Sequence, residues 1–194
     1  MSLLFPSLFD EVLFWVVILG GFAEHVWAVG RAAGLRQPVV KKDKDEPRLA
    51  ALAAFLFLLP IPIAVGYARI GVLPSYLFYP GLVVWIAGLA ITSWGIFVLG
   101  RFVLGFARVV SGHRVIQEGP FRLIRHPIYA GEILGWIGLG LALQSWVALL
   151  MILLASAIHY GNLMRVEERF LAAELGDEYV QYTKRTKRMI PFIL

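Results

Sequence analysis

Five long apolar runs, separated by short segments that carry most of the charge, determine what this chain can fold into. The runs cover residues 12–30, 49–68, 77–100, 128–143 and 146–164 of 194. A helix needs about 20 apolar residues to cross a bilayer, and 59% of this sequence is hydrophobic, against about 45–50% in soluble domains. The runs predict an all-α, multi-pass integral membrane protein. It would have five transmembrane helices, the last two forming a helical hairpin, followed by cytosolic C-terminal helices.

The number of lysine and arginine residues alternates between low and high in successive segments between these runs. The segment before the first run has none, and the following segments have six, one, five, none and six, which accounts for all 18. Cytoplasmic loops carry the excess of positive charge, so the pattern predicts a cell-membrane protein with an outside amino terminus and a cytosolic carboxyl terminus. Asp10 and Glu11 stand where a signal peptide would be basic, so we read the first run as a retained span. Because the charge follows the membrane boundaries, we expect no nucleic-acid partner.

We expect a single domain over residues 1–194, in four parts. Residues 1–100 hold three spans, 101–127 form a cytosolic loop, 128–164 form the hairpin, and 165–194 form the C-terminal helices. The absence of cysteine excludes disulfides and thiolate metal sites, and no His-Glu-x-x-His helix is present, so we expect no bound metal.

Four ionisable residues lie inside the runs near the ends that we place in the cytosol: Glu24, His25, Glu132 and His159. Ionisable groups in a span are costly and usually face a partner or a cavity. Pairing with a nearby arginine explains each one alone, but four at one leaflet favour a polar site. A cytosol-facing pocket with His126, Tyr129, Glu132 and Glu167 would suit a ligand with cationic and anionic parts, because carboxylates bind ammonium groups and aromatic faces attract cations.

Local patterns in the C-terminal half place these residues on helices. The segment RHPIYAG at 125–131 puts His126 at a helix cap, with proline at the first helical position. In EERFL at 167–171 the two adjacent glutamates point about 100° apart, so they cannot share one task. A short helix over 177–188 places Tyr179, Tyr182 and Thr186 on one face. The glycines at 81, 88 and 95, and at 131 and 135, predict close helix packing.

With Gly176, Arg188 and Pro191, these patterns resemble the isoprenylcysteine carboxyl methyltransferase family, a group that extends to membrane phospholipid methyltransferases. The resemblance covers the chain from residue 113 onward and is closest to five-helix archaeal or bacterial members. It implies S-adenosyl-L-methionine as cofactor, bound at the cytosolic end of the hairpin without a Rossmann domain, so that 101–127 becomes the cofactor loop. The cofactor-binding residues that it implies are His113, Arg114, Val115, Ile116, Phe121, His126, Pro127, Ile128, Tyr129 and Glu167. Phe121 replaces a tyrosine of the eukaryotic enzymes, so a hydroxyl contact is lost there.

The resemblance also implies the reaction, which is O-methylation of a lipid-embedded, isoprenylcysteine-type carboxylate. We expect His126, Glu168 and Arg125 to be the catalytic residues. A carboxylate is already ionised at neutral pH and needs no general base, whereas an amine would need one, which Glu168 or His126 could supply. Leu163 replaces the arginine that is implicated in holding the substrate of eukaryotic members, and this leaves the choice of acceptor open.

Three alternatives to that reaction remain at the level of sequence. The first is a phospholipid N-methyltransferase, and the second is an NADPH-dependent membrane reductase of the sterol type, which resembles the same C-terminal region. The third is a lipid-binding relative without activity. In the leading interpretation the partner is a prenylated or phospholipid acceptor that enters laterally from the membrane.

Overall fold

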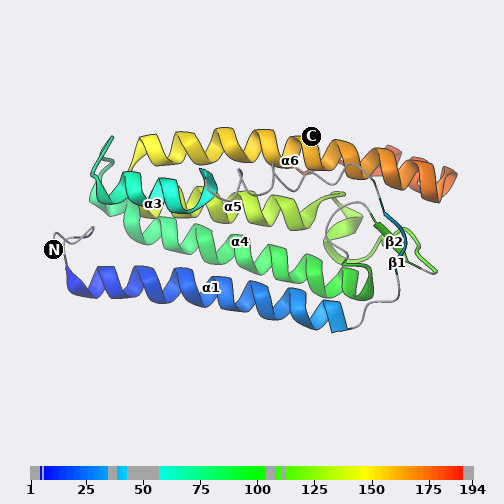
Figure 1. Cartoon of the computed structure of the whole chain (residues 1–194), viewed down its shortest axis with the longest axis horizontal. Coiled ribbons are helices and arrows are strands. Elements are labelled where there is room, and N and C mark those ends of the chain that lie inside the picture. The colour runs from blue at the N-terminus through cyan, green and yellow to red at the C-terminus, as the bar shows by residue number, and fades with distance from the viewer. Residues whose placement is uncertain are drawn as a thin grey trace.

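A bundle of long helices that share one axis forms the body of the molecule (Figure 1). The computed structural model describes residues 5, 7–34, 39–42, 57–103, 108–110 and 112–189. The main helices are α1 (Leu8–Gly34), α3 (Pro60–Tyr67), α4 (Phe78–Leu99), α5 (Pro127–Ala142), α6 (Trp146–Leu175) and α7 (Asp177–Arg185). Short 3₁₀ turns are η1 (Ser75–Leu77), η2 (Gly100–Phe102) and η3 (Gly119–Arg122), and β1 (Val39–Lys42) pairs antiparallel with β2 (Arg108–Val110).

The all-α membrane architecture is confirmed, but the number of five spans is not. Three segments of the described chain are long and apolar enough to cross a bilayer, namely Leu8–Ala32, Ser75–Phe102 and Trp146–Leu175, and Pro127–Ala142 is a shorter apolar helix. The predicted run over 49–68 lies partly outside the described residues, and its described part contains the eight residues of α3. Side chains such as Val16, Val83 and Ile158 are more than 60% exposed on the bundle surface, as expected of residues that face lipid.

Glycines bring α4 and α5 unusually close together. A Cβ atom added at Gly88 would lie 2.6 Å from the carbonyl oxygen of Gly131, and one added at Gly138 would lie 2.7 Å from that of Gly81. No larger residue fits these positions without movement of a backbone. The predicted close packing of the glycine-bearing spans is therefore confirmed, with α4 and α5 as the partners.

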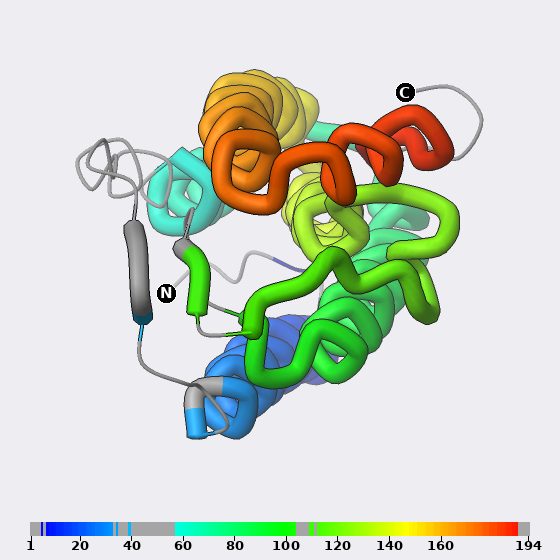
Figure 2. The backbone as a smooth tube through the Cα atoms, turned by 90° about the vertical axis from the view of Figure 1, so that its right-hand side faces the viewer, coloured from blue at the N-terminus to red at the C-terminus, as the bar shows by residue number. Residues whose placement is uncertain are grey.

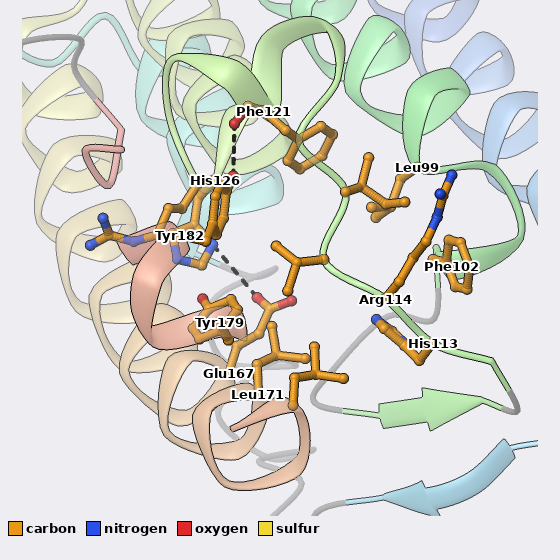
Figure 3. A pocket seen from close by; sticks show the side chains of 14 residues that line it. Leu99, Phe102, His113, Arg114, Phe121, His126, Glu167, Leu171, Tyr179 and Tyr182 are labelled. Carbon is orange, nitrogen blue, oxygen red and sulfur yellow. Dashed lines mark hydrogen bonds and ion pairs between the residues drawn. The ribbon is translucent and has the colours of Figure 1, made fainter. Parts of the chain in front are cut away.

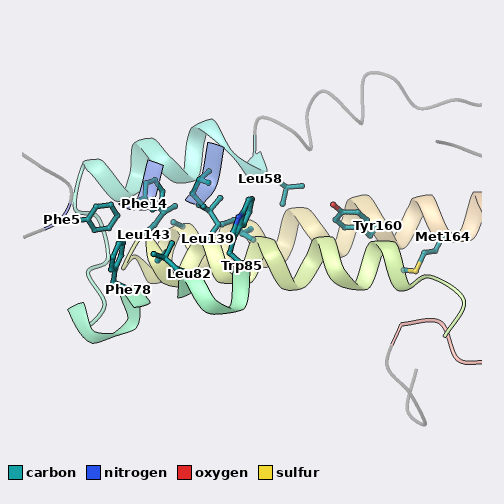
Figure 4. Close-up of a cluster of buried hydrophobic side chains, with 14 residues drawn as sticks. Phe5, Phe14, Leu58, Phe78, Leu82, Trp85, Leu139, Leu143, Tyr160 and Met164 are labelled. Carbon is teal, nitrogen blue, oxygen red and sulfur yellow. The ribbon is translucent and has the colours of Figure 1, made fainter. Parts of the chain in front are cut away.

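Large apolar side chains fill the rest of the bundle interior. Figure 4 shows them running along the helices, and they include Phe14, Leu82, Trp85, Leu139 and Leu143. All five are at most 5% exposed. This core fixes α1 and α6 against the α4–α5 pair.

At one end of the bundle the chain reverses after α6. Gly176 ends the helix with φ +59°, a left-handed conformation that favours glycine, and α7 then packs back against the bundle. Figure 2, seen along the bundle axis, shows α7 in red beside the loop that leads into α5. The helix ends at Arg185 rather than at the predicted residue 188, because Thr186 is extended and Lys187 forms a parallel bridge with Ile124.

Candidate active site

His126 caps α5, with Pro127 at the first helical position, as predicted. Its ring is buried and stacks on that of Tyr129 one turn later, with centroids 5.4 Å apart and an interplanar angle of 12°. The backbone amide of His126 donates to the carbonyl of Arg188 at 2.9 Å, and that of Arg125 donates to Lys187 at 2.7 Å. The segment after α7 therefore holds the residues that begin α5.

Glu168 of α6 is surrounded by cationic and hydrogen-bonding groups. Its Oε1 lies 3.0 Å from Nε of Arg125 and 3.1 Å from Nε2 of His126, and Oε2 accepts from Nη2 of Arg188 at 2.7 Å. Arg125 also donates to the backbone carbonyls of Thr183 and Thr186. Both carboxylate oxygens of Glu168 are thus occupied by contacts that join α6, α7 and the start of α5.

The neighbouring Glu167 has a different environment. Its Oε2 accepts a hydrogen bond from the Tyr129 hydroxyl at 2.8 Å and lies 3.7 Å from Nδ1 of His126. The two glutamates point in different directions, as their adjacent positions on a helix predicted. Glu167 faces two pockets, whereas Glu168 is absent from the walls of both.

The first of these, the outer pocket, opens at the end of the bundle near α7 (Figure 3). It holds about 640 Å³ of space, part of it open to solvent. Figure 3 shows side chains of α6 and α7 on one side and those of η2 and the following loop on the other. Seven of the ten residues expected to bind cofactor line it: His113, Arg114, Val115, Ile116, Phe121, His126 and Glu167.

The second, the inner pocket, shares His126, Glu167, Arg125 and Phe121 with the outer pocket and extends between the helices of the bundle. Its other lining residues include the remaining three of the expected set, Pro127, Ile128 and Tyr129. His25 of α1 and Glu132 of α5 also line it, and both continue into a third space, the core pocket. Aromatic side chains dominate the core pocket walls: Phe22, Trp85, Trp136 and Tyr160. The three pockets therefore adjoin in series from the end of the bundle into its core.

Burial controls the ionisable groups of the outer pocket. It raises the pKa of Tyr182 to about 12 and that of Tyr179 above its usual range, so both hydroxyls stay protonated. The Tyr182 hydroxyl donates to the carbonyl of Phe121 at 2.8 Å. Burial also lowers the pKa of His113, although the Glu178 carboxylate opposes this effect. His113 Nδ1 is buried and has no hydrogen-bond partner among the described residues.

The sequence indicated four ionisable residues in the spans but not which of them line a pocket. The structure brings His25 and Glu132 together at the inner pocket. Glu24 instead accepts a hydrogen bond from Ser93 at 2.7 Å, and His159 packs its ring edge on Tyr160. Tyr179 and Tyr182 were missed as pocket residues, although their three-residue spacing on a buried helix face was a usable signal.

This arrangement defines a membrane-embedded helical bundle with a polar pocket at one end that continues into an apolar interior. The family model described as phospholipid methyltransferase (PEMT) matches residues 77–178, more than half of the chain. The chain belongs to this family, and the resemblance found in the sequence is thereby confirmed. The matched region supplies most of the walls of all three pockets.

Individual relatives agree with this assignment. The chain is 35% identical over 88 residues to the cobalt-zinc-cadmium resistance protein CzcN of Cupriavidus metallidurans, which is 44% of this chain and 40% of that protein. It is 28% identical over 120 residues to a probable protein-S-isoprenylcysteine O-methyltransferase of Oryza sativa subsp. indica, covering 61% of this chain and 63% of that protein. The chain thus spans about 40–63% of the length of these two curated relatives.

A solved structure shares the fold. The eukaryotic intramembrane Ras methyltransferase ICMT (isoprenylcysteine carboxyl methyltransferase) superimposes with a TM-score of 0.63 at 21% identity. The match covers 92% of this chain and 67% of that one.

Proposed function

We propose that this chain is an S-adenosylmethionine-dependent methyltransferase that acts on a lipid-embedded acceptor, with an isoprenylcysteine-type carboxylate as the leading acceptor. The proposal depends on the shared wall of Arg125, His126 and Glu167 between an outer, solvent-open pocket and an inner pocket that continues between the apolar helices. A water-soluble donor and a lipid acceptor can therefore meet there from opposite sides. The names of the isoprenylcysteine methyltransferase relatives support this reaction class.

The outer pocket suits S-adenosylmethionine, which supplies an electrophilic methyl group on a sulfonium when it is bound. Glu167 is placed to bind its ammonium group, and the ring faces of Tyr179 and Tyr182 suit a cation. The unpartnered Nδ1 of His113 offers a hydrogen bond to a ligand in the same pocket. We assign Glu168 to positioning, because its oxygens already bind Arg125, His126 and Arg188.

The inner pocket would position the acceptor. A carboxylate is ionised at neutral pH, so the protein has to align and desolvate it rather than remove a proton. Leu163 is buried and offers no charge, and Arg125 is engaged by Glu168. The His25 side chain makes no hydrogen bond within the described residues and lines both the inner pocket and the core pocket, so we assign it to hold the acceptor carboxylate.

Glu132 favours a second candidate, methylation of a phospholipid amine. Glu132 lines the inner pocket, and a carboxylate there could bind an ammonium group or accept its proton. The family description is consistent with this acceptor.

One assay separates these reactions. Purified protein in lipid nanodiscs is incubated with methyl-labelled S-adenosylmethionine and either N-acetyl-S-farnesylcysteine or phosphatidylethanolamine. We expect base-labile label on the farnesylcysteine, which marks an ester. Base-stable label on the amine lipid would instead assign the second candidate. Labelling of neither, with thermal stabilisation by NADPH and not by S-adenosylhomocysteine, would replace both with the reductase.

The orientation of the molecule is part of the same proposal. The outer pocket, α7 and the carboxyl terminus would face the cytosol, with the amino terminus outside. The distribution of lysine and arginine supports this orientation.

A further inference from the structure

Helix α7 and the residues around it carry a basic surface that the proposed reaction does not use. This basic surface consists of Arg122, Lys184, Arg185 and Lys187, which are all exposed. None of the four pairs with a carboxylate of the described residues. Two exposed apolar side chains accompany them. Leu123, 54% exposed, accepts the amide hydrogen bond of Lys187, and Val180, 37% exposed, lies one helical turn before Lys184.

The basic surface lies close to the membrane boundary rather than at the far tip of the molecule. Arg188 bonds Glu168, which precedes the end of α6 at Leu175 by about 10 Å along the helix axis. The chain after α7 therefore returns toward the apolar part of the bundle. Exposed residues of α6 change from apolar at Ile158 to polar at Asn162, about 9 Å before Glu168. Lys187 consequently lies at the depth of lipid headgroups.

We propose that the basic surface binds the headgroups of anionic phospholipids. Each lysine or arginine next to an anionic leaflet favours association about fivefold. Exposed apolar residues among basic ones are typical of segments that lie in the interface, where the apolar parts enter the acyl boundary. Charge complementarity and membrane depth thus point to the same partner.

This contact has a consequence for the pockets. The carbonyl groups of Lys187 and Arg188 accept the amide hydrogen bonds of Arg125 and His126, two residues of the wall between the pockets. Lipid bound to the side chains of Lys184 and Lys187 favours the docked position of this segment, and so the arrangement of the wall. Anionic lipid should therefore strengthen ligand binding in the outer pocket. The effect on ligand binding rests on the proposed function, because that function identifies the ligand. The lipid contact itself does not depend on it.

The test compares nanodiscs of phosphatidylcholine alone with nanodiscs that also contain phosphatidylglycerol. Calorimetry with S-adenosylhomocysteine should show an affinity at least about threefold higher with the anionic lipid, and added salt should weaken this effect. A variant with Lys184→Gln, Arg185→Gln and Lys187→Gln should lose the difference. The matched control with Lys184→Arg, Arg185→Lys and Lys187→Arg should retain it. Measurable affinities that are equal in both lipids for the wild type, or an unchanged lipid effect in the glutamine variant, would overturn the coupling.

A second measurement does not depend on the cofactor. The sequence has no cysteine, so Val180→Cys can carry a single polarity-sensitive fluorophore. Its emission should shift to the blue when phosphatidylglycerol is present, and the shift should vanish in the glutamine variant. Unchanged emission would overturn the lipid contact and mean that the surface faces water or another partner. A shift without any S-adenosylhomocysteine binding would support the lipid contact while rejecting the proposed function.

Discussion

At the scale of single residues, two adjacent glutamates show how a helix divides tasks. Glu168 holds the structure together through Arg125, His126 and Arg188, whereas Glu167 contacts Tyr129 and faces both pockets. Loss of the Glu167 carboxylate should therefore produce a different defect from loss of the Glu168 carboxylate. In the proposed function, Glu168 positions the wall and Glu167 binds the cofactor against it.

Glu167→Gln tests that division. The change keeps the volume of the side chain but removes the charge that would bind the ammonium group of the cofactor. We expect weaker S-adenosylhomocysteine binding by about 1.5–3 kcal/mol, the scale of a charge-assisted hydrogen bond, without loss of the fold. Calorimetry measures the affinity, and Asp177→Asn, an exposed acid on α7, is the control. Equal binding by wild type and Glu167→Gln would remove Glu167 from the cofactor site.

His25→Ala tests the acceptor side of the wall. We expect kcat/KM for the carboxylate acceptor to fall about tenfold, the scale of one lost hydrogen bond. Binding of S-adenosylhomocysteine should stay unchanged, because His25 does not line the outer pocket. His159→Ala is the matched control, since this histidine lines none of the three pockets. A parallel loss of cofactor binding would show that His25 acts on the structure rather than on the acceptor.

At the scale of helices, the contact between α4 and α5 depends on backbone approach rather than on interlocking side chains. Membrane helices associate without a hydrophobic driving force between them, so close packing supplies the attraction. The glycine contact also fixes where α5 begins, and His126 with it. The site is therefore sensitive to a contact between backbones, whose α5 partners Gly131 and Gly135 also line the core pocket.

Gly88→Ala should show this sensitivity. The new Cβ would lie 2.6 Å from the carbonyl of Gly131, so the helices must separate. We expect a loss of about 1–3 kcal/mol in the free energy of unfolding, as for other overpacked sites. Gly161→Ala on α6 is the control, because nothing lies within 4 Å of its added Cβ. Thermal unfolding in detergent compares them, and equal stability of the two variants would contradict the close contact.

The helices were easier to predict from the sequence than the contacts between them. Local chemistry fixed His126 as a cap and Gly176 as the end of α6, because proline and glycine act through their own backbones. The same sequence could not show that His25 and Glu132 line the same two pockets, because that depends on how α1 packs against the α4–α5 pair. Nor could it show that Thr186 is extended, because this depends on the bridge between Lys187 and Ile124.

At the scale of the whole molecule, the serial order of the pockets matters most. The outer pocket lies at the end of the bundle that also carries α7, and the core pocket lies between the helices. In the proposed function, the donor would occupy the outer pocket and the acceptor the spaces between the helices. This division requires that the outer pocket face the compartment that holds the donor.

Cysteine labelling tests that orientation. We expect Ser75→Cys, exposed at the opposite end of the bundle, to react with a membrane-impermeant maleimide on intact cells. Gln117→Cys and Gln181→Cys, both exposed near the outer pocket, should react only after permeabilisation. The cysteine-free wild type serves as the blank. Labelling of positions 117 and 181 from outside would place the pocket away from a cytosolic donor.

The backbone pairing of residues 187 and 188 with residues 125 and 126 has a consequence for biosynthesis. Every long helix of the bundle is translated before the segment that completes the wall. A nascent chain interrupted before Thr186 would therefore insert its helices and pack their glycine contact while the backbone amides of Arg125 and His126 still lacked their hydrogen-bond acceptors. The wall is therefore completed last, and under the proposed function a chain that ends before Thr186 should be inactive.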